Sequence, residues 1–113
     1  MTARAVVVNK RATAPLPTDR YIGRPTKWGN PFSHLDGTLA SFRVADRRQA
    51  VWEYARWLLG QPDLLASLDE LRDGRLVCWC HPASCHGHVL AFVLDHGIEA
   101  LAARVAAHDY GAS

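Results

Sequence analysis

One stretch decides the fold and the candidate chemistry of this chain, Arg-Leu-Val-Cys-Trp-Cys-His-Pro-Ala-Ser-Cys-His-Gly-His (residues 75–88). It holds all three cysteines and three of the six histidines. Residues 76–80 alternate apolar and thiol side chains after a glycine, which predicts a buried strand. Pro82 ends that strand, and a helix is predicted to begin at Ser84 or Cys85. A strand end, a short turn and a helix N-terminus therefore meet at several thiols and imidazoles.

The length and composition are those of an ordinary globular domain. The chain has 113 residues, of which 49% are hydrophobic and 21% charged, and this predicts one domain over residues 1–113. It has neither a signal-peptide core nor a run of about 18 apolar residues, so we expect a cytoplasmic protein without a membrane partner. Thiols stay reduced there, and three clustered cysteines then favour metal binding or a reactive thiol over disulfides. The sequence leaves the oligomeric state open.

The net charge of +2 hides an uneven distribution of charge. Residues 1–60 carry ten Lys and Arg against four Asp and Glu, whereas residues 61–113 carry three against seven. A basic first half suits a ligand that carries phosphate, either a nucleotide-like small molecule or a nucleic acid. The alternative is a solvated surface on which the charges segregate without a partner.

Strand and helix signals alternate along the rest of the chain. Residues 5–9 are predicted to form a central strand, residues 21–22 a short strand, and residues 39–43 a strand or an extended lead-in. Asp46 is predicted to cap a helix that ends at Leu59. The apolar residues of that helix recur at i, i+3, i+4 and i+7, which predicts a core stripe of Val51, Tyr54, Ala55 and Leu58.

Two further helices are predicted, besides the one that begins at Ser84 or Cys85. The first is short and amphipathic, begins near Pro62 and ends before Gly74, with an apolar face of Leu64, Leu65, Leu68 and Leu71. After the helix that follows residue 85, Gly97 is predicted as a C-cap. An alanine-rich helix is predicted over residues 98–107, and residues 109–113 are predicted to fray.

This order of elements predicts a small single α/β domain with a short, mainly parallel sheet flanked by helices. In such folds ligands bind at the carboxyl ends of strands, which is where the Cys/His turn (residues 78–88) lies. We therefore expect the strand 75–80 to be central. Its end should face the same cavity as the loop 23–32.

The Cys/His turn has three interpretations, of which the first is a metal site. A zinc ion would be bound by three cysteines and one histidine, Cys78, Cys80, Cys85 and His86, with His81 and His88 as alternatives to His86. Residues i and i+2 of a strand lie about 6.6 Å apart, whereas two sulfurs on one zinc lie about 3.8 Å apart. Either the strand bends by Cys80, or an iron–sulfur cluster accepts the wider spacing.

The second interpretation is a catalytic thiol. Cys85 at a helix N-terminus beside His86 has the setting in which a dipole and an imidazolium lower the pKa of a thiol. Such a strand–turn–helix junction is also a natural cradle for an anion. The third interpretation is structural, because unmodified cysteines are among the most buried residues and Cys78 lies on a core strand.

The loop 23–32, Gly-Arg-Pro-Thr-Lys-Trp-Gly-Asn-Pro-Phe, is the second candidate site. Arg24 and Lys27 could bind a phosphate, Asn30 a base or sugar, and Trp28, or Phe32 in its place, could stack on a ring. The alternative is a loop that its aromatic residues pin into the core. A rigid Pro/Gly frame that holds such side chains favours a functional role.

These two motifs, Tyr-Ile-Gly-Arg-Pro-Thr-Lys-Trp-Gly-Asn-Pro-Phe (residues 21–32) and Cys-Trp-Cys with Pro-x-x-Cys-His-Gly (residues 78–87), resemble a small domain family called DUF4326. The resemblance extends over residues 6–94, and members of that family occur in bacteria, notably actinobacteria, and in phages. The family has no established activity, so the resemblance implies a relationship without a mechanism. It also implies an acidic residue after the His-Gly pair, where this chain has His88.

The residues together favour a small enzyme, a hydrolase or transferase acting on a nucleotide, nucleoside or modified base. The loop 23–32 would bind this ligand, and the Cys/His turn would hold zinc or an iron–sulfur cluster, with Cys85 and His86 as the catalytic pair. One alternative is a non-catalytic, metal-stapled module that binds nucleic acid or a host protein. The other is a metal-free Cys–His thiol enzyme.

Overall fold

The computed structural model describes residues 5–12, 14–24, 26–33, 42–44, 46–79 and 85–107. Its main sheet is parallel, with the strand order β1 (Val7–Asn9), β5 (Leu76–Cys78), β2 (Arg20–Tyr21). The predicted central position of β5 is confirmed. The prediction that residues 5–9 form a central strand is wrong, because among the described strands β1 pairs only with β5 and lies at the edge of the sheet.

Burial explains why β5 takes the central place. All three of its residues are buried, whereas only the first residue of β1 is. A strand covered on both faces reads as a continuous apolar run, the usual pattern inside parallel sheets. Main-chain hydrogen bonds continue past the strand ends, from Lys10 N to Cys78 O (2.8 Å) and from Ile22 N to Val77 O (3.0 Å). The carboxyl ends of all three strands therefore lie along one edge.

A second, two-stranded parallel sheet joins β3 (Phe32–Ser33) to β4 (Phe42–Arg43). β4 confirms the extended segment expected within residues 39–43, of which the structure describes only the end. β3 was not predicted, because two residues are too few to show a strand's alternation.

The first helix, α1 (Arg47–Leu59), forms as predicted. The Asp46 carboxylate accepts a hydrogen bond from Gln49 N (2.8 Å), and Gly60 is the C-cap. The predicted stripe of Val51, Tyr54, Ala55 and Leu58 is buried.

The second predicted helix divides into α2 (Pro62–Ala66) and a 3₁₀ helix (Leu68–Leu71). The break falls at Ser67, whose hydroxyl bonds back to Asp63 O (2.9 Å), a local bond that competes with regular helix. Leu64, Leu68 and Leu71 are nevertheless buried. The chain then continues through α3 (His86–His96), Gly97 with φ 97° and α4 (Ile98–Ala106), as predicted.

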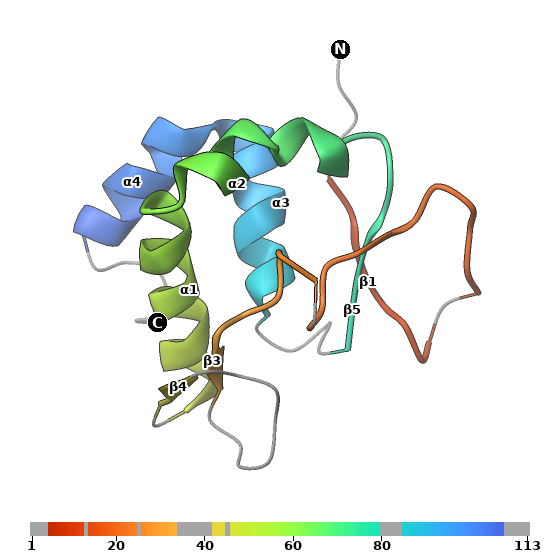
Figure 1. Ribbon diagram of the computed structural model, residues 1–113, viewed down its shortest axis with the longest axis horizontal. Coiled ribbons are helices and arrows are strands. Elements are labelled where there is room, and N and C mark those ends of the chain that lie inside the picture. The colour runs from red at the N-terminus through yellow and green to blue at the C-terminus, as the bar shows by residue number, and fades with distance from the viewer. Residues whose placement is uncertain are drawn as a thin grey trace.

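The helices pack in layers on one face of the main sheet. Helix α3 contacts β1 and β5 directly, and α1 and α4 pack against α3 on its far side (Figure 1). The predicted α/β class is confirmed. In the part of the chain that the structure describes, the helices fall short of the length and apolar character needed to cross a bilayer.

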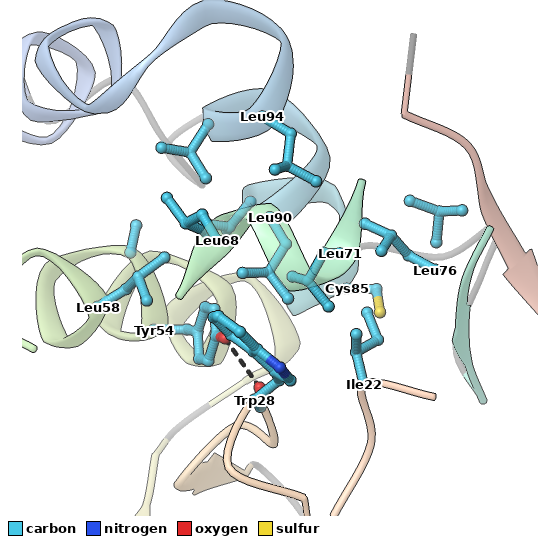
Figure 2. Close-up of a cluster of buried hydrophobic side chains, with 14 of the residues drawn as sticks. Ile22, Trp28, Tyr54, Leu58, Leu68, Leu71, Leu76, Cys85, Leu90 and Leu94 are labelled. Carbon is cyan, nitrogen blue, oxygen red and sulfur yellow. Dashed lines mark hydrogen bonds between the residues drawn. The ribbon is translucent and has the colours of Figure 1, made fainter. Parts of the chain in front are cut away.

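The two faces of β5 differ in their surroundings. Leu76 belongs to the core beneath α3, together with Ile22 and Cys85 (Figure 2), and Cys78 belongs to the same core. Val77 points to the other face, where it lines a cavity under the loop that joins β1 to β2. The alternation of β5 thus places the Cys78 thiol on the helix side of the sheet and Val77 on the open side.

Candidate functional site

Cys85 begins α3 as its N-cap residue. Its backbone is extended (φ −151°, ψ 149°), and its Sγ accepts a hydrogen bond from Gly87 N at 3.3 Å. A sulfur in this position replaces the side-chain oxygen that usually satisfies the first amides of a helix. The side chain is only 2% exposed, so the thiol lies inside the protein at the positive end of the helix dipole.

His86, the first residue of α3, is held by the chain that follows β2. Its Nε2 lies 2.6 Å from the carbonyl oxygen of Ile22. Since a carbonyl only accepts, Nε2 carries the proton and Nδ1 has a lone pair. Nδ1 lies 3.8 Å from Sγ of Cys85. Ile22 therefore fixes both the orientation and the tautomer of the imidazole, with its basic nitrogen toward the thiol.

Burial keeps this imidazole neutral. The pKa of His86 is lowered to about 4, mainly by burial; the hydrogen bond to Ile22 opposes this shift, and the charges of Arg24 and His88 add to it to a smaller extent. The ring lies edge-on to that of Tyr54, with 5.1 Å between centroids. Burial, with a smaller contribution from Cys85, raises the pKa of Tyr54 well above its usual range. At neutral pH the site thus holds an uncharged imidazole and an uncharged phenol.

Tyr54 joins the Cys/His site to the loop 23–32. Its hydroxyl donates to the carbonyl oxygen of Trp28 at 2.8 Å, drawn as a dashed line in Figure 2. The sequence placed Tyr54 in the core stripe of α1 but gave no sign of this role, because both partners are remote in sequence. The site therefore includes a residue that the motifs did not indicate.

The position that follows the Cys-His pair has no room for a side chain, which explains why it is Gly87. A Cβ at this position would lie 2.9 Å from Cδ1 of Ile22 and 3.1 Å from Cγ1 of Val7. Both distances are shorter than ordinary carbon contacts. The glycine lets α3 approach the sheet closely enough for His86 to reach the Ile22 carbonyl.

The metal prediction concerns Cys78, Cys80, Cys85 and His86. Cys78 and Cys85 share the core beneath α3, whereas Cys80 and His81 lie outside the described residues. Within the described ranges no group of three His, Cys, Asp or Glu side chains is arranged to hold a metal ion. The four-residue metal set therefore stays a prediction.

The donor atoms of Cys85 and His86 are spaced as two ligands of one zinc ion would be. Two ligands of a tetrahedral zinc, a sulfur at about 2.3 Å and a nitrogen at about 2.0 Å, lie about 3.6 Å apart. The separation of Cys85 Sγ from His86 Nδ1 is 3.8 Å. Metal-bound histidines commonly donate their other N–H to a carbonyl, as His86 does to Ile22.

The loop 23–32 is folded on itself. Thr26 bonds to Gly23 O through both its amide (3.0 Å) and its hydroxyl (2.6 Å), and Gly29 N bonds to Thr26 O (2.9 Å). Arg24 is half-buried and close enough to affect the pKa of His86. The structure thus places one predicted phosphate-binding residue near His86.

The other three predicted ligand-binding residues have contacts within the protein. The Trp28 ring is buried in the core. Asn30 is also buried, donating from Nδ2 to Ala50 O (3.1 Å) and accepting from Phe32 N (2.9 Å). Lys27 is exposed and pairs with Glu70 at 2.9 Å. A ligand-binding role for these three stays a prediction, and the contacts of Trp28 agree with a loop pinned into the core.

A cluster of aromatic and basic side chains on the open side of the same edge was missed in the sequence. The indole Nε1 of Trp79 donates to the Tyr21 hydroxyl (2.8 Å), and that hydroxyl donates to Arg24 O (3.1 Å). Lys10 and Arg11 lie over these rings. One signal was available: Trp79 directly follows Cys78 within the predicted strand 75–80, and successive residues of a strand point to opposite faces.

Taken together, the fold and these contacts define a small α/β domain with a Cys/His centre at the carboxyl edge of a parallel sheet. The chain belongs to the DUF4326 family, described as a domain of unknown function, whose model matches residues 6–96. This confirms the resemblance of the two motifs. No curated protein and no solved structure matches the chain.

Proposed function

We propose that this protein is a small enzyme, a hydrolase or transferase, that acts on a nucleotide, nucleoside or modified base through a zinc-binding Cys/His centre. The observation that carries this proposal is the arrangement of His86, whose Nε2 is held by Ile22 and whose Nδ1 faces Cys85 Sγ at 3.8 Å. Cys85 and His86 would hold the metal, with one of Cys78 and Cys80 as the third ligand and the fourth position left open to water. Zinc in such a site supplies a Lewis acid that activates a water molecule.

Zinc fits these two residues better than an iron–sulfur cluster does. Ligands of different irons in a cluster lie further apart than ligands of one ion, whereas Nδ1 and Sγ are as close as two donors on one zinc. The lowered pKa of His86, about 4, also favours metal binding, since a metal ion needs the neutral ring. The iron–sulfur cluster remains the alternative that a spectrum tests.

The substrate class rests on position and charge. Ligands of parallel α/β sheets bind at the carboxyl ends of strands, and Cys85 follows β5 at that edge. Arg24, whose charge affects His86, can bind a phosphate bidentately. The loop 23–32 carries Arg24, and the hydrogen bond from the Tyr54 hydroxyl to Trp28 O holds this loop in place. The residues of this chain would thus bind and orient an anionic substrate beside the metal ligands.

A second candidate, a metal-free thiol enzyme, is favoured by one observation. The Cys85 sulfur accepts the Gly87 amide at 3.3 Å and lies within reach of the basic Nδ1 of His86. That is the arrangement in which an imidazole takes the proton of a nucleophilic thiol. The low pKa of His86 makes it a weak base at neutral pH, which is why we place the metal centre first.

The deciding experiment is metal analysis of the anaerobically purified protein, together with its absorption spectrum. We expect one zinc per chain and a colourless protein. A broad absorption band near 400 nm would indicate an iron–sulfur cluster instead of zinc. Cys85→Ser should release the zinc, whereas His96→Gln, at the exposed end of α3, should retain it. A protein without metal whose Cys85 reacts with iodoacetamide at neutral pH would establish the thiol enzyme instead.

Cys80→Ser and Cys78→Ser together separate an enzyme from a metal-stapled module. Four protein ligands close a zinc site, whereas three leave a position for water. Zinc retained by either the Cys80→Ser or the Cys78→Ser protein would mean an open, reactive site, and zinc lost from both would mean a closed, structural one. Arg24→Ala should weaken binding of a phosphate-bearing substrate by about 1.5–3 kcal/mol, the usual contribution of a charge-assisted hydrogen bond. Lys27→Ala, which removes a cation already paired with Glu70, is the matched control.

A further inference from the structure

The open side of the sheet edge presents an exposed tryptophan that is held in position. Trp79 is 47% exposed, and its only polar atom, Nε1, bonds to the Tyr21 hydroxyl at 2.8 Å. Its main-chain oxygen accepts a hydrogen bond from Nδ2 of Asn9 (3.0 Å). An indole fixed at its polar atom loses little further freedom when a flat ligand stacks on it.

Two basic side chains lie beside this ring. Nζ of Lys10 is 5.6 Å from the centroid of Tyr21 and 5.9 Å from that of Trp79, and the guanidinium carbon of Arg11 is 5.4 Å from the latter. Asn9 accepts a hydrogen bond from Arg11 N at 2.8 Å, so it orders the main chain of both Trp79 and Arg11. Cations and aromatic rings interleaved in this way bind phosphate and base together.

A cavity of about 240 Å³ lies beside this aromatic and basic cluster. Its walls are the open face of the sheet and the loop between β1 and β2, with the lining residues Val8, Lys10, Pro15, Asp19, Tyr21 and Val77. Asp19 is bound by Arg75 through two nitrogens, at 2.8 and 2.9 Å. The wall is therefore rigid, and the carboxylate charge is compensated.

We propose that this open side binds a mononucleotide. The base enters the cavity against Tyr21, Trp79 forms the aromatic rim, and the phosphate lies at the mouth beside Lys10 and Arg11. This inference goes beyond the proposed function, because the site lies on the face of the sheet opposite the Cys/His centre. The Tyr21 hydroxyl, which also bonds Arg24 O at 3.1 Å, connects this side to the Cys/His side.

The shape of the cavity favours a single nucleotide over a strand. Binding sites for drug-sized ligands have volumes of about 300–1,000 Å³, so about 240 Å³ suits one base and little more. Single-strand binding proteins instead use an extended groove with several stacking residues in succession. Pro15 and Asp19 close this cavity within one loop.

The test is calorimetric titration of the full chain with AMP, GMP, CMP, UMP, the matching nucleosides, inorganic phosphate and a four-residue oligonucleotide. At least one monophosphate should bind at least tenfold more tightly than its nucleoside and than phosphate alone. Lys10→Ala/Arg11→Ala should remove that preference over the nucleoside. Trp79→Ala should weaken binding at least tenfold, and Trp79→Phe, which keeps a ring but loses the N–H, should stay within about threefold of the wild type.

The control is a similar pair on α1, where the Arg56 guanidinium lies 4.9 Å from the Trp52 ring centroid. Arg56→Ala should leave every affinity unchanged. The proposal is overturned if no monophosphate binds, if phosphate alone binds as tightly, if Trp79→Ala has no effect in a folded protein, or if the oligonucleotide binds tenfold more tightly than every monophosphate.

Metal content is a separate measurement on the same sample. Zinc without nucleotide binding would contradict only this inference, and nucleotide binding without zinc would contradict only the zinc centre.

Discussion

The two sides of the carboxyl edge of the sheet carry opposite kinds of chemistry on neighbouring residues. Cys78 faces the helices and is 1% exposed, whereas Trp79 is 47% exposed. The buried side has thiols and a neutral imidazole, and the open side has aromatic rings and cations. One strand end therefore supplies both kinds of side chain, because successive residues of a strand point to opposite faces.

The buried side and the open side of the sheet edge are held in place by different contacts. On the buried side, His86 is bound by Ile22, 64 residues away in the chain, and Tyr54 by Trp28, 26 residues away. Among the described residues, every buried side-chain nitrogen and oxygen has a hydrogen-bond partner. On the open side the contacts leave the rings accessible. We infer that the buried side is built for fixed geometry and the open side for recognition.

The largest expected effect tests this division through Tyr54. Tyr54→Ala removes a fully buried aromatic side chain and its bond to Trp28 O, so the free energy of unfolding should fall by about 3–5 kcal/mol. Trp79→Ala on the open side should lower it by no more than about 1 kcal/mol. Urea denaturation of both variants measures the contrast.

Tyr54→Phe separates packing from hydrogen bonding at the same position. It keeps the ring but leaves the Trp28 carbonyl without its donor, which should lower the free energy of unfolding by about 1–2 kcal/mol. Equal losses for Tyr54→Ala and Trp79→Ala would remove the distinction between a rigid side and an accessible side.

The second prediction concerns pH and applies to protein freed of metal by a chelator. The pKa of His86 falls from 6.5 to about 4 on folding, so between these values the unfolded chain binds a proton that the folded protein does not. The free energy of unfolding should therefore be highest above pH 6.5 and should fall as the pH is lowered toward 4. The total loss should be about 3 kcal/mol.

Urea denaturation from pH 7.5 to 4.5 measures this loss, with two substitutions as references. His86→Gln should remove this part of the pH dependence, because the titrating ring is absent. His96→Gln should retain it, because His86 is still present. An unchanged pH dependence in the His86→Gln protein would show that the buried imidazole is not its source.

The sequence predicted those features of the fold that depend on neighbouring residues. Helix α1 follows from Asp46, Gly60 and a repeated apolar spacing, and each of these signals acts within a few turns. The central position of β5 was predicted because the Cys/His turn follows its carboxyl end, where ligands bind in such sheets. The central position predicted for residues 5–9 was wrong, because three valines look alike in an edge strand and a central strand until their partners are known.

The candidate site was predicted only as far as it is local. Cys85 and His86 are adjacent, so their encounter at a helix N-terminus could be predicted from spacing alone. The contact with the Ile22 carbonyl could not be predicted, because every residue has a main-chain oxygen and the sequence does not show which one His86 contacts. The cluster around Trp79 was missed because Lys10 and Arg11 follow a different strand, β1, and the parallel pairing of β1 with β5 brings them to the same edge as Trp79.

The smallest expected effect concerns Gly87, where the buried side lacks space for one methyl group. A Cβ would lie 2.9 Å from Ile22 and 3.1 Å from Val7, and such overpacking costs about 1–3 kcal/mol. Alanine regains up to about 1 kcal/mol through its higher helix propensity. Gly87→Ala should therefore lower the free energy of unfolding by about 1 kcal/mol, measured by urea denaturation.

Gly60→Ala is the matched control for the same chemical change. Its nearest neighbour would be the Trp57 carbonyl oxygen at 3.4 Å, and φ is −91°, so alanine fits there without strain. If the buried side tolerated extra volume, the two alanine variants would be equally stable. If it is as tightly built as its hydrogen bonds indicate, Gly87→Ala should also push α3 away from Ile22. The contact of His86 Nε2 with the Ile22 carbonyl would then lengthen, and zinc affinity would fall together with stability, whereas Gly60→Ala should leave zinc affinity unchanged.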